Sequence, residues 1–235
     1  MINHYFIYDG VPSTDFGTFL ASSNLFDAPE KDVERKQVPG RNGEILIPNN
    51  RYHNFELTAT AVIPHRLINN VENLKAFLMS RNGYCRYEES YHPDKYRMAC
   101  FIKSFEMGAM NKHQGVVDLH FICKPQQFLK AGEISKTYSK AGEIWNPTYF
   151  EAQPMIRAYG YGHIYIGDYE IQIAQSTLPY VDIDCERMDV YYKTTNCNNM
   201  IAFGNDFPKL AHGETSISFD NTISKIDITP RWWTI

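Results

Sequence analysis

Two stretches of this chain alternate apolar and polar residues with the period of a β-strand. Residues 55–63 read Phe-Glu-Leu-Thr-Ala-Thr-Ala-Val-Ile, and residues 117–123 read Val-Asp-Leu-His-Phe-Ile-Cys. Because successive side chains of a strand point to opposite faces, each stretch predicts a strand with one face in a core. Residues 96–105 are rich in β-forming residues and predict another strand. A sheet is therefore expected in the first half of the chain.

One segment of the first half follows the period of a helix instead. Its apolar residues lie on one stripe at helical spacing: Leu67, Val71, Leu74, Phe77 and Leu78. Pro64 lies just upstream, and Gly83 supplies a left-handed stop after the stripe. The sequence predicts a single helix here, packed on the sheet by that stripe.

The second half shows strand patterns throughout. Short alternating segments follow one another at residues 155–159, 163–166, 169–173, 180–184, 188–193, 215–219 and 223–229. Gly160, Gly162 and Pro179 lie where turns are needed between them. Many short strands separated by turn signals are typical of an antiparallel β-sandwich. The fold class expected is thus mainly β, with one helix in the first half.

Charge and a short repeat suggest where the two halves meet. Residues 1–132 carry a net charge of +1 and residues 133–235 carry −5. Lys130-Ala131-Gly132-Glu133-Ile134 recurs as Lys140-Ala141-Gly142-Glu143-Ile144. The predicted domains are 1–132 and 151–235, with 133–150 as a linker, or as a hairpin whose arms are the two copies.

Composition argues against several classes of function. The net charge of −4 provides no basic field to hold DNA or an anionic membrane. No apolar stretch approaches the roughly 20 residues that span a bilayer. The five cysteines are scattered without a metal-binding spacing, which predicts reduced thiols. No metal or cofactor is expected.

Few residues suggest chemistry. No phosphate-binding loop, zinc-protease pair or nucleophile elbow is present. The segment Tyr159-Gly160-Tyr161-Gly162 lies between strands and predicts a turn rather than a phosphate loop. Asp182, Asp184 and Glu186 share one face of a strand. They could bind a cation or act as paired acids, but a solvated strand face is favoured.

Tyrosines are abundant in the second half and allow two interpretations. Tyr161 and Tyr165 are the surface aromatic candidates, and such residues can form a platform for sugar rings. Aromatic residues on a sheet serve more often in packing or in interfaces with other proteins. The interface interpretation is favoured, and sugar binding stays open.

In order along the chain, these features resemble the distal tail proteins of long, non-contractile phage tails. The resemblance is carried by an ordered set of segments together with the single helix that ends near residue 83: 35–44, 52–55, 91–99, 121–126, 146–147, 153–156, 180–186, 207–210 and 213–217. No one motif is specific, but the set spans almost the whole chain.

The resemblance implies a virion structural protein without catalysis or cofactor. The N-terminal domain would form a hexameric ring at the tail tip, and the C-terminal domain would be a galectin-like sandwich. The implied partners are other copies of the chain, the tail tube protein, the tail-associated hub protein and receptor-binding or baseplate proteins. DNA would pass through the lumen, no membrane would be bound, and assembly would occur in the host cytoplasm, from a phage or a prophage.

The resemblance also assigns an assembly role to a few residues of the first half. These assembly-interface candidates are Arg35, Gly40, Arg41, Asn42 and Gly43. Residues 27–36 carry charges of both signs, and they could supply part of the complementary patches that a ring needs. A solvated loop explains the same residues equally well.

Two functions of other classes remain as alternatives. The first is a carbohydrate-binding adhesion module acting through the C-terminal sandwich, with Tyr161 and Tyr165 at its surface. The second is a wall hydrolase that uses Asp182, Asp184 or Glu186.

Overall fold

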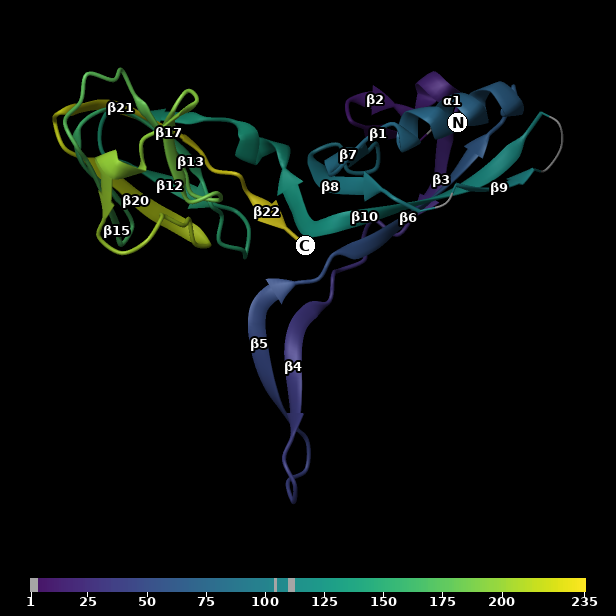
Figure 1. Cartoon of the computed structure of the whole chain (residues 1–235), viewed down its shortest axis with the longest axis horizontal. Coiled ribbons are helices and arrows are strands. Elements are labelled where there is room, and N and C mark those ends of the chain that lie inside the picture. Colours follow the sequence, from purple (N-terminus) through teal and green to yellow (C-terminus); the bar gives the residue numbers. More distant parts are fainter. Residues whose placement is uncertain (1–3, 104, 110–112) are drawn as a thin grey trace. The chain divides into compact units, whose positions relative to one another are not determined.

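The computed structural model describes residues 4–103, 105–109 and 113–235, and the chain is built mainly of β-strands (Figure 1). It divides into two compact units, Met1–Gln127 with Ile235, and Phe128–Thr234. One α-helix occurs in the described part of the chain, and it lies in the first unit. The predicted fold class, mainly β with one helix and a second half of antiparallel sheets, is confirmed.

The first unit is organised around one antiparallel sheet. Its strands run in the order β2-β1-β7-β8-β10-β6-β3, and β9 also pairs with β10. The bounds are β1 Phe6–Tyr8, β2 Val11–Pro12, β3 Phe19–Ser23, β6 Phe55–Ile63, β7 Cys85–Glu89, β8 Lys95–Phe101, β9 Glu106–Ala109 and β10 Gly115–Leu129, with a 3-10 turn η1 at Ser13–Phe16.

The alternation in the sequence becomes the core face of this sheet. β6 and β10 pair in continuous register from Gly115 opposite Ile63 to Cys123 opposite Phe55. Phe121 lies among four aromatic rings with centroids 5.0 to 6.2 Å away, those of Phe6, Tyr8, Tyr87 and Phe101. The polar residues of both strands lie on the other face, as the period of two requires.

Helix α1, Leu67–Met79, covers the core through its predicted stripe. Leu67, Leu74 and Leu78 are buried, and Val71 and Phe77 are partly buried against the same core. Arg66 at the N-cap and Gly83 beyond the last turn both have positive φ, 50° and 74°. The helix and its apolar face are therefore as predicted.

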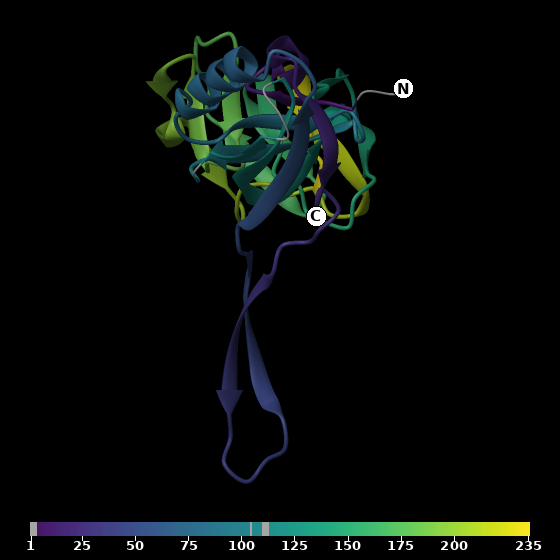
Figure 2. The same ribbon diagram turned by 90° about the vertical axis from the view of Figure 1, so that its right-hand side faces the viewer.

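Strands β4, Lys31–Gln37, and β5, Glu44–Tyr52, follow β3 and precede β6 in the sequence. They form a separate two-stranded sheet. Figures 1 and 2 show it as a long ribbon. A solvated loop was one of the two interpretations of residues 27–36, but most of this segment is strand. The period of two is weak here because neither face of the ribbon enters the core of the chain.

The second unit consists of two further antiparallel sheets. One has the order β11-β21-β13-β16-β17-β18, and the other has the order β12-β20-β14-β15-β19. The bounds are β11 Lys136–Tyr138, β12 Gly142–Asn146, β13 Met155–Gly160, β14 Gly162–Ile166, β15 Tyr169–Ile173, β16 Val181–Asp184, β17 Asp189–Tyr192, β18 Thr195–Asn196, β19 Ile201–Phe203, β20 Gly213–Phe219 and β21 Ile223–Thr229, with 3-10 turns η2 at Lys130–Glu133 and η3 at Asn198–Met200. A last short strand, β22 Trp233–Thr234, pairs with β10 and belongs to neither of these two sheets.

Buried aliphatic side chains from both sheets share one core, so the second unit is a β-sandwich. Ile144 and Ile217 come from one sheet, and Ile156, Ile183 and Ile228 come from the other. The seven strands expected from the sequence are all present within one or two residues of their predicted ends. All five cysteines are free.

The two copies of Lys-Ala-Gly-Glu-Ile do not pair with each other. The first copy forms η2, and the second leads into β12, whose partner is β20. Between them, β11 pairs with β21 of the opposite sheet. The hairpin interpretation of residues 133–150 is therefore wrong, because each strand of this segment completes a different layer of the sandwich.

Candidate assembly surfaces

The structure brings the assembly candidates together at one end of the β4–β5 hairpin. Arg35 lies on β4, and Gly40, Arg41, Asn42 and Gly43 lie in the loop that joins β4 to β5. All five residues are exposed. Their grouping follows from local structure alone, because a hairpin places the end of one strand beside the start of the next.

Backbone geometry accounts for the two glycines of this loop. Gly40 has φ +77° and Gly43 has φ +83°, values that strain any residue with a Cβ. A Cβ at either position would meet no atom within 4 Å. The constraint is therefore the turn itself, in which the Arg41 N–H donates to the Val38 carbonyl at 3.1 Å.

The hairpin exposes an unusual amount of apolar surface for a strand pair. Leu46 is 62% exposed and Ile45 is 41% exposed, while Val38 and Ile47 are each more than a third exposed. In the pairing register Leu46 lies opposite Arg35, and Ile45 opposite Lys36. An isolated two-stranded ribbon is marginally stable in water, and exposed apolar patches rimmed by charges mark interaction sites.

The root of the hairpin is fixed to the sheet of the first unit. The buried guanidinium of Arg97 donates to the Leu25 carbonyl at 3.4 Å and lies over the Phe55 ring at 4.5 Å. On the entry side, the Asn24 Oδ1 accepts from the Thr58 N–H at 2.8 Å, and the Asn24 N–H donates to the Thr58 carbonyl at 3.3 Å. The chain therefore leaves and re-enters the sheet at an anchored point.

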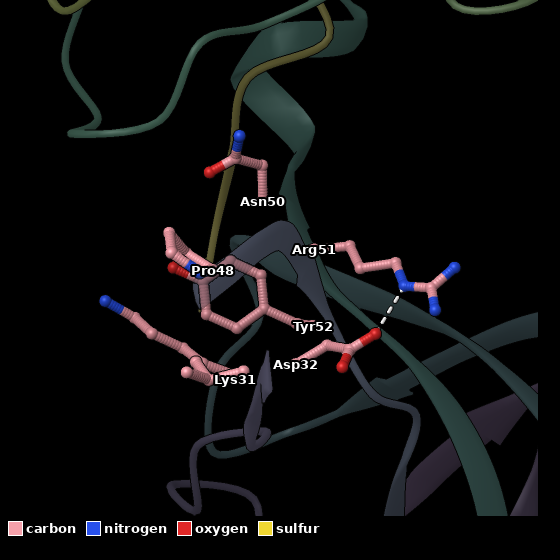
Figure 3. Close-up of a pocket in the computed structure, with 7 residues that line it drawn as sticks. Lys31, Asp32, Pro48, Asn50, Arg51 and Tyr52 are labelled. Atoms are coloured by element: carbon pink, nitrogen blue, oxygen red, sulfur yellow. Dashed lines mark hydrogen bonds and ion pairs between the residues drawn. The ribbon is translucent and has the colours of Figure 1, made fainter. Parts of the chain in front are cut away.

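A small hollow of about 250 Å³ lies beside the first residues of the ribbon (Figure 3). There the Arg51 Nε donates to Asp32 Oδ2 at 2.6 Å, and Asn49 Nδ2 donates to Asp32 Oδ1 at 3.0 Å. Hydrogen bonds from Asn49 and Arg51 lower the pKa of Asp32. The hollow is below the size usual for organic ligands, so the polar contacts serve to brace the ribbon.

Sequence reasoning did not identify the apolar part of this surface. The run Ile45-Leu46-Ile47, bounded by Gly43 and Pro48, is a strand signal that could have revealed it. Its exposure could not have been predicted, because short apolar runs are usually buried.

The second group of candidates lies on the sandwich. Tyr161 is in the turn between β13 and β14, and Tyr165 is on β14; both are partly exposed. His163, between them, places its ring 6.2 Å from that of Tyr165 and donates from Nδ1 to Glu170 Oε1 at 2.7 Å. The structure thus brings His163 and Tyr165 together on one face of β14 and places Tyr161 in the turn before it.

The glycine-rich segment beside them is a turn, as predicted. Gly160 and Gly162 have φ +123° and +120° and join two strands of opposite sheets. A Cβ on Gly160 would lie 2.3 Å from the Thr222 carbonyl oxygen. The glycines are needed for this close crossing between layers.

The interpretation of Asp182 and Asp184 as members of a solvated face is wrong. Both residues are buried on β16, which pairs with β13 along one edge and with β17 along the other. Asp182 accepts two hydrogen bonds from Arg157, at 2.7 and 3.0 Å. Asp184 accepts two from Arg231, at 2.6 and 3.1 Å.

These pairs leave neither aspartate available as a general acid or base. Asp184 also accepts from the backbone N–H groups of Glu186 and Arg187, at 3.1 and 3.2 Å. Burial alone would raise the pKa of Asp184, but the hydrogen bonds from Arg231 and the backbone lower it. The sequence did not reveal Arg157 and Arg231 as partners, because Arg231 lies 47 residues away.

The described residues contain neither a metal-binding cluster nor a membrane-spanning helix. No group of three or more His, Cys, Asp or Glu among them could hold a metal ion. No helix in the described ranges is long and apolar enough to cross a membrane.

Comparison with known proteins identifies a solved structure with the same fold. No family model matches the chain, and no curated protein matches it. Among solved structures, the crystal structure of SPP1 Dit (gp 19.1) matches with a TM-score of 0.73 at 15% sequence identity, covering 99% of both chains. That protein is described as a paradigm of the hub adsorption apparatus in phages that infect Gram-positive bacteria. The chain therefore has the fold of SPP1 Dit over its whole length.

Proposed function

We propose that this protein is a structural hub of a phage tail tip, located in the virion and without catalytic activity. The observation that carries the proposal is the fold match to SPP1 Dit, which extends over both units rather than one. A shared β-sandwich alone would not indicate function, since such sandwiches serve many purposes. The whole succession of a sheet with one helix, a hairpin and a sandwich is far more restrictive.

In this proposal the first unit, with the ring-forming role predicted for residues 1–132, assembles into a hexamer. The second unit carries receptor-binding or baseplate proteins. The ring would join the tail tube to the tail-associated hub protein, with DNA passing through its lumen. A ring interface joins two different patches of each subunit.

The β4–β5 hairpin supports this proposal as one of those patches. It is anchored at its root and exposes Leu46 and Ile45 beside Arg35 and Lys36. Burying such a ribbon against a second copy would remove apolar surface from water, with about 25 cal/mol gained per Å².

Light scattering coupled to size exclusion tests the proposal. We expect a species of six copies of the 27.2 kDa chain, about 163 kDa. Leu46→Asp should reduce this to a monomer, whereas Ile68→Asp, at a similarly exposed position of α1, should leave the mass unchanged. A protein that stays monomeric with its tube and hub partners, and rescues no tail-assembly defect, would contradict the proposal.

A carbohydrate-binding role remains a second candidate because Tyr165 is exposed beside His163 on β14 and Tyr161 is exposed in the turn that precedes this strand. Glycan arrays of host wall polysaccharides test it directly. Any binding should be lost in Tyr161→Ala and Tyr165→Ala, and binding that survives both changes would exclude this face.

A further inference from the structure

The sandwich sheet β12-β20-β14-β15-β19 has an outer face of one charge sign. Its inner face supplies Ile144, Ile164, Ile166, Ile171 and Ile217 to the core. The outward side chains of its strands include three glutamates, Glu143, Glu170 and Glu214. None of the five strands contains a lysine or an arginine.

The other sheet of the sandwich is different. Its strands carry Lys136, Arg157 and Lys225, and basic side chains contact three of its four aspartates. Arg157 binds Asp182, Arg231 binds Asp184, and Lys225 lies 3.8 Å from Asp227. The acidic sheet has no lysine or arginine on its strands; Glu170 contacts His163, and Glu143 and Glu214 lie side by side.

Aromatic side chains gather at the β12 edge of the acidic face. Trp145 on β12 is 57% exposed, and Tyr149 in the following loop is 86% exposed. The His212 ring stacks on Tyr149 with centroids 4.6 Å apart and meets Trp145 edge-on at 6.2 Å. The three rings form a continuous exposed group, which we call the aromatic edge.

A buried amide holds this edge in place. Asn146 is fully buried and donates from Nδ2 to the carbonyls of Phe150 and Leu210, both at 2.9 Å. Its Oδ1 accepts from the N–H and the hydroxyl of Thr148, at 2.9 and 2.8 Å. The loop that displays Tyr149 is therefore ordered before any partner arrives, so binding would cost little ordering entropy.

The glutamates lie beside the aromatic edge. Glu214 pairs in register with Trp145, and Glu143 lies two residues before Trp145 on the same side of β12. A hydrogen bond that protonated Glu214 donates to the Glu143 carboxylate, together with the negative charge of Glu143, raises the pKa of Glu214. Two carboxyl groups held this close repel each other when both are ionised, and a cation placed between them would relieve that repulsion.

We propose that the aromatic edge and Glu143 and Glu214 together dock an arginine-bearing segment of another virion protein. The inference rests on the proposed function and names the chemistry of the partner that the second unit carries. Arginine fits because its planar guanidinium binds carboxylates in a bidentate manner and stacks on aromatic rings. Anionic wall polymers would be repelled by this face, and a neutral sugar would leave the two carboxylates unrelieved.

A photo-crosslinker in assembled particles tests the docking. We place p-benzoylphenylalanine at Ser216, which is exposed and lies opposite Glu143 in the register, so that Trp145 and both glutamates stay intact. The matched control position is Ser224, exposed on β21 of the other sheet. Mass spectrometry of irradiated particles should identify a crosslink from position 216, and none from 224, to a segment containing arginine.

A charge-removing pair of variants then tests the glutamates. Glu143→Gln combined with Glu214→Gln should lower the crosslink yield about tenfold, the loss expected for one charge-assisted hydrogen bond. Glu151→Gln combined with Glu186→Gln removes the same charge elsewhere in the second unit and should leave the yield unchanged.

Each remaining outcome overturns the inference. Particles that contain the protein but give no crosslink from 216, or a crosslink to a segment without arginine, reject the docking while the hub role stands. Binding of a wall glycan that Trp145→Ala abolishes would reassign the face to sugar. Particles that lack the protein would reject the hub role and, with it, the docking.

Discussion

Strands β5 and β6 are neighbours in the sequence and have the same length of nine residues, yet they meet opposite environments. β6 buries Leu57, Ala59, Ala61 and Ile63 completely. β5 carries a comparable apolar run, but Leu46 at its centre is 62% exposed. The difference lies in what the rest of the chain provides: β6 has β10, β3 and α1 around it, whereas β5 pairs only with β4 in the described structure.

The largest expected effect comes from the helix that closes the core over β6. Leu74→Asp would place an unpaired charge at a fully buried position of α1, costing about 5 kcal/mol of unfolding free energy, comparable with the whole stability of a domain. Ile68→Asp, on the exposed side of the same helix, is the control and should cost less than about 0.5 kcal/mol. Equal denaturant midpoints for the two variants would show that the assigned helix face is wrong.

The same substitution on the two neighbouring strands tests the comparison directly. Leu57→Ala should lower the unfolding free energy by about 2–5 kcal/mol, because it leaves a cavity beneath β6. Leu46→Ala should change it by less than about 0.5 kcal/mol in the monomer. Urea denaturation at low protein concentration measures both. A large loss for Leu46→Ala would mean that β5 already has a partner within its own chain.

A third variant tests how much the ion pair of buried Asp184 on β16 contributes to stability. Asp184→Asn should cost about 2 kcal/mol, since it removes the buried carboxylate that accepts two hydrogen bonds from Arg231. Glu186→Gln, on the half-exposed neighbour, is the control and should have little effect. If both variants unfold like the wild type, the ion pair contributes specificity rather than stability.

The pH dependence of stability sharpens this test. Because the pKa of Asp184 is lowered in the folded protein, its contribution is complete above the ordinary carboxyl pKa of about 4. The contribution shrinks as the pH falls below that value and vanishes once the folded carboxyl is protonated. Thermal unfolding of Asp184→Asn should therefore show a flatter slope in this acidic range than the wild type.

The smallest effect is expected at the tip of the hairpin. Gly43→Ala forces a Cβ into φ +83° and should weaken the β4–β5 pairing by about 1 kcal/mol. Hydrogen exchange of the amides in β4 and β5 measures this local loss, while global unfolding stays unchanged. Asn42→Ala, in the same loop, is the control; equal exchange in both variants would show that the turn relaxes without cost.

The core strands could be predicted from the sequence because burial of one face makes apolar and polar residues alternate along them. The alternation at 55–63 and the stripe from Leu67 to Leu78 each reflect one face turned toward a core that the chain itself supplies. The hairpin lacks such a regular pattern of apolar and polar residues, since both of its faces are exposed in the monomer. Its candidate residues Arg35 and Arg41 were reached through the family resemblance, and their role stays a prediction.

The burial of Asp182 and Asp184 could not be predicted from the sequence. Alternation correctly placed Val181 and Ile183 in the core, but it assigned the intervening aspartates to solvent. Their burial depends on Arg157 and Arg231, which arrive from other strands, and no local pattern encodes such a pairing. The exposure of Trp145 and Tyr149 could not be predicted for a similar reason. The sequence pattern of an amphipathic strand is the same whether its outer face contacts water or a partner protein.

The exposed tip of the hairpin has a consequence for the lifetime of the protein. Arg35, Lys36 and Arg41 lie on or beside an exposed loop, the kind of segment that proteases cut first. A subunit whose ribbon is covered by a neighbour would withhold these bonds from cleavage, whereas a surplus subunit would offer them. Proteolysis would then selectively remove the unassembled subunits and adjust the amount of this protein to the number of tails.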